Sequence, residues 1–415
     1  MTDQSSLSAI QWRVVLLLVC AFVLEGFDLQ VVAFASPSIV AEWGISKQSL
    51  GPAMAASLVG MIIGSALGGR WGDRIGRRPT VVGSIAIFSA ATLLTAWSGS
   101  VNQIALLRVV AGFGFGAAQT TAMALLAEWL PSETRSRVVS AVVVSVPGGG
   151  MLGAALCAWL IPAAGWRAAF VAGGALPGVL ALLLLLYLPE SPGFLRLREG
   201  GSSQPNDRAA VMQLLRAPYL TTTLGLAVAF FSNLAASYAF FSWIPLMVSS
   251  LHYPAAAGIR GSFFFNLFGA VGVLLGARAL AGWKPTRGLF LFVAVGLASM
   301  VSLALSLRGL TIVGEPTAAG LVLLMTLLAL AGVGTVGVQA GLYGVASTVY
   351  PTSCRATGIG IAGSVGRLGA IVSSYSGGAI LSLASGVNVF LVIVALLFVV
   401  SGLGIWLVSS GDRRP

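Results

Sequence analysis

Four ionisable residues stand out because each lies inside or at the edge of a long apolar stretch: Glu25, Asp28, Arg108 and Arg367. A charged side chain at the centre of a bilayer costs about 2.5–3.5 kcal/mol on insertion scales, so such residues usually have a function. Glu25 and Asp28 are three residues apart and share one face of a helix. Because burial disfavours the charged form of a carboxylate, both acids are candidates for carrying a proton.

The depth of Arg108 predicts that it can meet one of these acids. It lies about 8 Å below the outer end of its helix at 1.5 Å per residue, and Asp28 lies about 10 Å below the outer end of its own. An Asp28–Arg108 pair is therefore possible, and together with Glu25 it forms our predicted proton-coupling group. Gln119 lies on the Arg108 face of the same helix and is a candidate substrate ligand.

Arg367 is the strongest candidate for binding an anion. It lies about 16 Å from the inner end of its helix, near the middle of a hydrocarbon core roughly 30 Å thick. Its planar guanidinium fits a carboxylate. Polar and aromatic residues of two further helices suit an aromatic substrate that carries ring hydroxyls. Those candidates are Asn233, Tyr238, Gln339 and Tyr343.

The elements that must position these residues are membrane-spanning helices. The chain has 415 residues, of which 57% are hydrophobic and 8% charged. A soluble protein carries about 25% charged residues, so a soluble enzyme is excluded, and the insertion of most segments into lipid excludes a DNA-binding protein. Stretches of about 20 mainly apolar residues predict spanning helices. Twelve occur, at roughly 12–35, 49–69, 80–98, 103–129, 138–161, 167–188, 219–243, 258–280, 287–307, 318–344, 356–383 and 387–409.

These helices predict an all-α polytopic membrane protein with two six-helix halves. We expect an N-terminal half over 1–189, a cytoplasmic linker over 190–218 and a C-terminal half over 219–415. If the N-terminus is inside, 17 basic residues fall in inner segments and four in outer ones, so both termini should be cytoplasmic. The formal net charge of +11 thus reflects topology rather than a nucleic-acid partner.

Short motifs repeat between the two halves. Gly76-Arg77-Arg78-Pro79-Thr80 matches 282–286, and Pro131-Ser132-Glu133-Thr134-Arg135 matches 351–355. Parallel repeats of this kind mark transporters that place the substrate between two halves at the bilayer midplane.

Charged residues at the predicted cytoplasmic ends of the helices could form a gate that opens and closes. Asp73 could meet Arg135 or a helix N-terminus, and Glu128 is more suited to this loop than to a substrate. The candidate gate residues are Asp73, Arg74, Arg77, Glu128, Arg135 and Arg355. Ala279 and Leu280 replace Asp73 and Arg74 in the second half, so the gate should be asymmetric.

The segment 69–78, with sequence GRWGDRIGRR, resembles the signature of the major facilitator superfamily. The Glu25-Gly26-Phe27-Asp28 motif, the Arg108 helix, Pro189-Glu190-Ser191 and the 350–370 segment resemble the aromatic acid:proton symporters within it. Benzoate and hydroxybenzoate members usually have Asp at the first acidic position, where this chain has Glu25. Glu25 followed by Leu29-Gln30, and Ser145-Val146-Pro147, resemble more the members that carry hydroxyphenylpropionate.

This resemblance implies proton-coupled uptake of a small aromatic carboxylate, of hydroxyphenylpropionate or hydroxybenzoate type, by alternating access across the bacterial inner membrane. It also implies a monomer without catalytic residues, metal or other cofactor, driven by the proton gradient. A drug:proton efflux antiporter, or a symporter for another organic anion or a sugar, is the alternative. The departure of 147–153 from the efflux motif argues against the antiporter, and Arg367 suits neither an organic cation nor an uncharged sugar.

Overall fold

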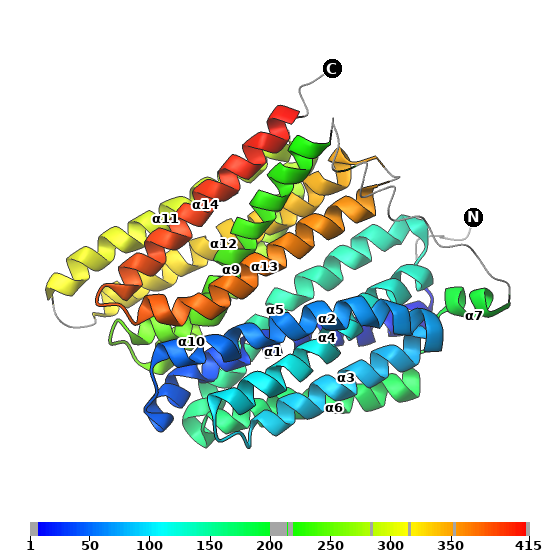
Figure 1. Cartoon of the computed structure of the whole chain (residues 1–415), viewed down its shortest axis with the longest axis horizontal. Helices are drawn as coiled ribbons and strands as arrows, with labels where there is room; N and C mark the ends of the chain where they lie inside the picture. Colours follow the sequence, from blue (N-terminus) through cyan, green and yellow to red (C-terminus); the bar gives the residue numbers. More distant parts are fainter. Residues whose placement is uncertain are drawn as a thin grey trace. The chain divides into compact units, whose positions relative to one another are not determined.

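The computed structural model describes residues 7–199, 214, 219–282, 285–313, 317–351 and 354–411, and the regular structure within them is helical (Figure 1). Twelve helices in these ranges have between 19 and 35 residues. The first group is α1 (Ala9–Trp43), α2 (Gly51–Ile75), α3 (Arg77–Thr95), α4 (Val101–Trp129), α5 (Ser132–Ala164) and α6 (Trp166–Tyr187). The second is α9 (Leu220–Ser249), α10 (Ala255–Gly282), α11 (Pro285–Val313), α12 (Ala318–Val349), α13 (Arg355–Leu381) and α14 (Gly386–Gly411). Two short elements, η1 (Lys47–Leu50) and α7 (Pro192–Glu199), complete the described structure.

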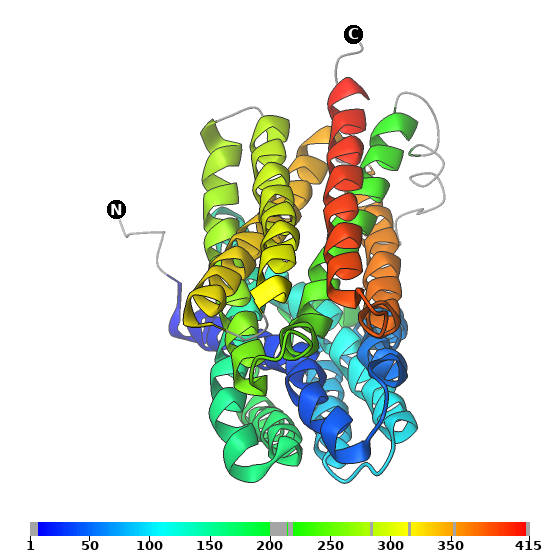
Figure 2. The same cartoon turned by 90° about the vertical axis from the view of Figure 1, so that its left-hand side faces the viewer.

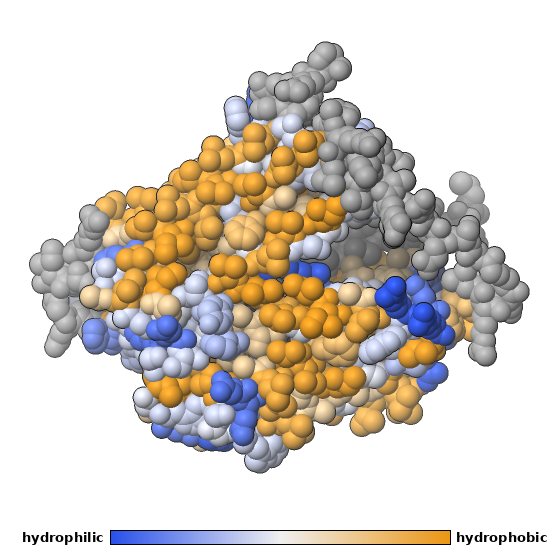
Figure 3. Space-filling model, in the orientation of Figure 1, coloured by the Kyte–Doolittle hydropathy of each residue, from blue (hydrophilic) through white to orange (hydrophobic). Residues whose placement is uncertain are grey.

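Eleven of the described helices are both long and apolar enough to cross a membrane, and α13 is long enough but less apolar than this requires. Its 27 residues would span about 40 Å, which is sufficient length. The shortfall comes from its many glycines and serines and from Arg367. Orange apolar side chains cover most of the surface that Figure 3 shows, as expected for helices whose outer faces meet lipid.

Several helices begin or end one or two turns beyond the apolar segments that predict them. The helix expected over 12–35 is α1, which continues to Trp43, and the one expected over 138–161 is α5, which begins at Ser132. Side-chain caps fix some of the starts, because Ser100 accepts a hydrogen bond from the Gln103 amide at 3.3 Å before α4. Helical backbone hydrogen bonds therefore continue past the end of the apolar segment, so a boundary predicted from apolarity alone is too short.

The chain forms two compact units. Unit 1 comprises Met1–Ala35 and Pro52–Ser203, and unit 2 comprises Ser36–Gly51 and Gln204–Pro415. Residues 36–51 thus belong to unit 2, and the first residues after 189 belong to unit 1. The end of α1 and η1 belong to unit 2, in which η1 packs against α13. The first residues after 189 belong to unit 1, where α7 packs against α4.

Within unit 1, glycines allow pairs of helices to approach closely. A Cβ atom at Gly26 of α1 would overlap the Val146 carbonyl of α5, and one at Gly149 of α5 would overlap the Val23 carbonyl of α1. Helices α2 and α4 approach each other in the same way at Gly60. Helix α3 packs against α4 and α6. Small residues at helix contacts are the usual means of close packing within a membrane.

Unit 2 repeats these pairings with its own helices, which Figure 2 shows in colours from green to red. Helix α9 packs against α13, α10 against α12, and α11 against α12 and α14. Glycines again lie at the contacts, with Gly369 against Phe231 and Gly332 against Phe265. The two six-helix units therefore share one packing scheme, as the repeated loop motifs predict.

Candidate functional site

A buried ion pair joins α1 to α4 in unit 1. The Arg108 guanidinium donates to both carboxylate oxygens of Asp28, at 2.8 and 2.9 Å, and these residues are 0% and 6% exposed. Arg108 also donates to Thr92 Oγ1 of α3 at 2.7 Å, and Thr92 donates to Asp28 Oδ1 at 2.9 Å. Three helices thus share one hydrogen-bonded triad, and charge-assisted bonds of this kind are the strong ones.

Arg108 also makes longer, weaker contacts with two further side chains. Thr95 Oγ1 lies 3.5 Å from its guanidinium, and the Phe170 ring centroid of α6 lies 5.7 Å from its Cζ. Nε of Arg108 has no hydrogen-bond partner among the described residues. Removal of one partner of a buried pair costs about 3–5 kcal/mol because the other charge is left uncompensated. The structure therefore places Asp28 and Arg108 together, as their depths predict, and their part in proton coupling stays a prediction.

Glu25 lies one turn away from Asp28 but takes part in a separate contact. It is 4% exposed, and Gln119 of α4 donates to its Oε1 at 3.1 Å. A cavity of about 20 Å³ lies beside these two side chains, with otherwise apolar walls from α1, α3, α4 and α6. That volume holds about one water molecule. Gln119, predicted as a substrate ligand, is thus placed against an acid of the predicted proton-coupling group.

In unit 2 the predicted ligands of α9 and α12 come together. Asn233 Nδ2 donates to Gln339 Oε1 at 2.7 Å, and the Tyr343 hydroxyl interacts with the Gln339 side chain. The Tyr343 ring packs edge-on against Phe230, with centroids 5.0 Å apart. Asn233 is 1% exposed, and its Oδ1 has no donor among the described residues. A buried acceptor without a donor is free to bind a hydroxyl group.

Arg367 of α13 lies beside this cluster. Its charge acts on Tyr343, and a Cβ atom at Gly363, one turn before Arg367, would lie 4.0 Å from the Tyr343 hydroxyl oxygen. The guanidinium is partly exposed and has no carboxylate partner within the described residues. The structure thus gathers a cation, an amide pair and a phenol within unit 2. Tyr238 lies elsewhere on α9, where its ring packs against Phe241 with centroids 5.5 Å apart.

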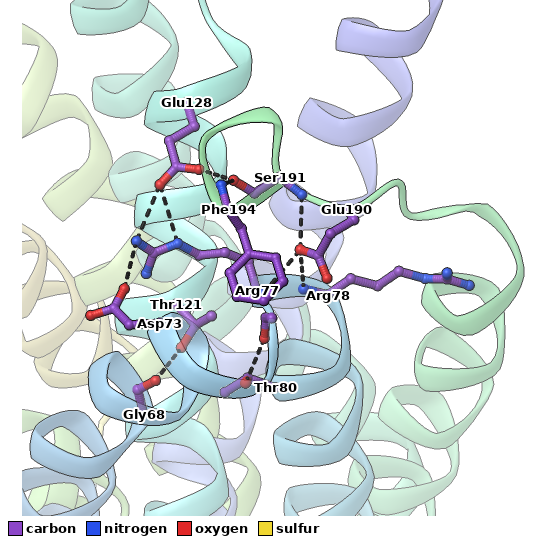
Figure 4. A network of polar contacts seen from close by, with 11 residues as sticks. Gly68, Asp73, Arg77, Arg78, Thr80, Thr121, Glu128, Glu190, Ser191 and Phe194 are labelled. Atoms are coloured by element: carbon purple, nitrogen blue, oxygen red, sulfur yellow. Dashed lines mark hydrogen bonds and ion pairs between the residues drawn. The ribbon is translucent and has the colours of Figure 1, made fainter. Parts of the chain in front are cut away.

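A second polar network surrounds the junction of α2 and α3 (Figure 4). Gly76, with φ 111°, separates the two helices by a single residue and adopts a backbone conformation that other residues rarely reach. Across this break, Arg77 pairs with Asp73 at 2.9 Å and with Glu128 of α4 at 3.1 Å. Arg77 therefore links the end of α2 to the end of α4.

Glu190 and Ser191 complete this junction network, which comprises Asp73, Arg77, Glu128, Glu190 and Ser191. Glu190 Oε1 accepts hydrogen bonds from the backbone amides of Arg77, Arg78 and Ser191, at 3.0, 3.0 and 2.8 Å. It therefore caps the N-terminus of α3, where a negative charge is stabilising. The Ser191 hydroxyl donates to Glu128.

The remaining gate candidates are placed differently. Arg74 is exposed, and the side chain of Arg135 lies outside the described residues, so the expected Asp73–Arg135 contact stays a prediction. In unit 2, Arg355 Nε donates to the Tyr350 carbonyl at 3.2 Å. Burial raises the pKa of Tyr350, whose hydroxyl donates to Thr223, so the phenol stays neutral at physiological pH.

Sequence reasoning missed four residues of these networks. Thr92 and Thr95 are ordinary in an apolar helix, and nothing in their spacing indicates that they bind an arginine. Glu190 and Ser191 carried a usable signal, because an acid in a strongly basic segment is unusual. The resemblance of Pro189-Glu190-Ser191 to a motif of known transporters does not by itself indicate that these residues bind the start of α3.

Two repeated bundles of membrane-length helices, each with polar residues buried inside it, define a multi-pass membrane transporter rather than an enzyme. The sequence model of the family described as the Major Facilitator Superfamily matches residues 18–315 of this chain. The chain belongs to this family.

Similar proteins include the gallate transporter of Pseudomonas putida, 33% identical over 99% of this chain and 94% of that protein. The 4-hydroxybenzoate transporter PcaK of the same species is 32% identical, over 95% and 91%. The 3-(3-hydroxy-phenyl)propionate transporter of Escherichia coli K12 is 30% identical, over 100% and 97%. The crystal structure of a D-xylose-proton symporter has the same fold, with a TM-score of 0.77 and 19% identity over 95% of this chain and 97% of the other.

Proposed function

We propose that this protein takes up a small hydroxylated aromatic carboxylate together with a proton, by alternating access across the bacterial cytoplasmic membrane. The observation that carries the proposal is the cluster of Arg367, Tyr343, Gln339 and Asn233 in unit 2. The names of the relatives support it, since gallate, 4-hydroxybenzoate and 3-(3-hydroxyphenyl)propionate each combine a carboxylate, an aromatic ring and a ring hydroxyl.

Each part of such a substrate has a candidate partner in this cluster. Arg367 is the partner of the carboxylate, because its guanidinium is partly exposed and can form a bidentate pair. Tyr343, which is 42% exposed as a residue, offers an aromatic ring to the substrate ring. Asn233 Oδ1 is the acceptor for a ring hydroxyl, because it is buried and has no donor among the described residues.

The proton-coupling part of the proposal rests on unit 1. Glu25 and Asp28 are membrane-buried carboxylates with different surroundings, since Asp28 is bound by a cation and Glu25 by an amide. Protonation of Asp28 would weaken its hold on Arg108, and the α1–α4 contact would change with it. The Asp73–Arg77–Glu128 chain is the gate component that would break and reform during the cycle.

The direction of transport and the orientation are also proposed. The excess of basic residues in segments on one side supports cytoplasmic termini. No cofactor is required, because the proton gradient supplies the driving force.

A substrate panel tests the cluster directly. Purified protein in proteoliposomes is given labelled 4-hydroxybenzoate with unlabelled competitors that lack either the carboxylate or the ring hydroxyl. We expect competition by hydroxylated aromatic acids and little by the matching alcohols or amides. Asn233→Ala should remove the preference for hydroxylated acids over benzoate, whereas Asn266→Ala, which changes another buried asparagine, should keep it. Equal competition by acids and amides would refute the assignment.

A further inference from the structure

A groove lies on the surface of unit 2 between α10 and α12, away from the cluster described above. It has a volume of about 430 Å³. Its walls are largely apolar, with Phe264 and Phe268 from α10 and Val322, Thr326 and Leu330 from α12. The Thr326 hydroxyl donates to the Val322 carbonyl at 2.9 Å, so this wall presents no unused donor.

The groove faces away from the substrate cluster. Leu330 and Gln339 are nine residues apart on α12, which is two and a half turns, so their side chains leave the helix on opposite sides. Helix α10 contacts α12 at Gly332, and α11 contacts it at Gly334. Leu330 and Val322 are 40% and 67% exposed. In a membrane protein, an exposed apolar groove on the outer side of a bundle meets lipid tails.

One end of the groove carries a charge. Arg260 lines the groove and is exposed, and it takes part in no hydrogen bond or ion pair within the described residues. It is the sixth residue of α10, about 8 Å from the end of the helix. An arginine at this depth extends its charged group toward the level of the lipid headgroups.

The groove between α11 and α14 provides an internal comparison. It is also apolar, with a volume of about 320 Å³, and Asn388 is its polar residue. Among the residues that the structure describes, no charged side chain lines it. Within those residues, the α10–α12 groove therefore differs from the α11–α14 groove by the presence of Arg260 at its end.

We propose that the α10–α12 groove binds a phospholipid, with an acyl chain between Phe264, Phe268 and Leu330 and an anionic headgroup phosphate on Arg260. The distance from Arg260 to Phe268 is about 12 Å along the helix, so the groove holds most of one acyl chain. The positive charge of Arg260 favours an anionic over a zwitterionic lipid. Each basic residue near a membrane surface raises the binding constant for anionic lipid about fivefold. The proposal does not depend on which substrate is transported.

Native mass spectrometry of delipidated protein in detergent tests this site. Phosphatidylglycerol and phosphatidylethanolamine with identical acyl chains are titrated separately, and the first binding constant is compared. We expect wild-type protein to prefer phosphatidylglycerol by about fivefold. Arg260→Gln should bring this ratio close to one. Arg167→Gln, which removes another arginine predicted on the same side of the membrane, should leave it unchanged.

A second pair of variants tests the acyl-chain part. Thr326→Trp fills the α10–α12 groove and should reduce phosphatidylglycerol binding, whereas Val392→Trp in the α11–α14 groove should not. Gel filtration and thermal unfolding establish that each variant is folded. The proposal is overturned if Arg260→Gln keeps the full preference, if Arg167→Gln loses as much, or if inorganic phosphate alone displaces the lipid.

Discussion

The buried pair of Asp28 and Arg108 yields the sharpest prediction about stability and transport together. Replacing Asp28 by Asn leaves the Arg108 charge buried at 0% exposure, with Thr92 and Thr95 as its described hydrogen-bond partners. The same logic applies in reverse to Arg108→Gln, which leaves an unpaired carboxylate. Each single change should cost about 3–5 kcal/mol of stability.

The double variant should be less damaged than the sum of the two. In Asp28→Asn with Arg108→Gln both charges are gone, and an Asn–Gln pair can keep one or two hydrogen bonds across the same α1–α4 contact. A coupling energy of at least about 2 kcal/mol is therefore expected from the cycle.

The assay combines denaturant unfolding in detergent with two transport measurements on the folded fraction. Gradient-driven accumulation requires proton release, whereas exchange of substrate across the membrane does not. If Asp28 carries the proton, Asp28→Asn should lose accumulation and keep exchange, and the double variant should behave likewise. Additive losses of stability would refute the pairing energetics, and full accumulation by Asp28→Asn would refute the proton role.

Three further variants test other contacts. Arg367→Gln should lower uptake of carboxylate substrates at least 100-fold, and Arg367→Lys should restore only part of it because the bidentate geometry is lost; uptake assays that show no change would move the anion site elsewhere. Glu190→Gln should destabilise the start of α3 by about 1 kcal/mol, measured by thermal unfolding, because the Arg77 and Arg78 amides lose a charged acceptor. An unchanged melting temperature would contradict this. Gly149→Val should prevent α1–α5 packing and abolish folded protein in gel filtration, whereas Gly148→Val, which has open space, should be tolerated; equal yields would contradict the close approach.

The fold could be predicted largely from composition, because lipid imposes long apolar helices and basic loops impose topology. Helix α13 is the element that composition predicts least clearly as a membrane-spanning helix. Its glycines serve close packing against α9, as at Gly369, and Arg367 lowers its apolarity further. The periodic loop motifs indicated the repeat, and the paired contacts of α9 with α13 and of α10 with α12 have counterparts in unit 1.

The parts of the site that depend only on depth in the membrane could be predicted from the sequence. Depth along the membrane normal brought Asp28 to Arg108, because both helices are measured from the same face. Depth does not indicate which helix packs beside α4 at the level of Arg108, so the contact of Arg108 with Thr92 of α3 could not be predicted. Asp73 was expected to meet Arg135 or a helix N-terminus. Its described partner is Arg77, the first residue of α3, which follows directly after the Gly76 break. The contact with Arg135 stays a prediction.

Accumulation of a labelled aromatic acid in proteoliposomes is the most direct measure of the central claim. Vesicles are loaded at high internal pH and diluted into a lower external pH, so that the proton gradient points inward. We predict that labelled 4-hydroxybenzoate accumulates above its equilibrium distribution, that a protonophore collapses this accumulation, and that Arg367→Gln abolishes it. Accumulation that is indifferent to the gradient, or that requires an outward-directed one, would contradict proton-coupled uptake.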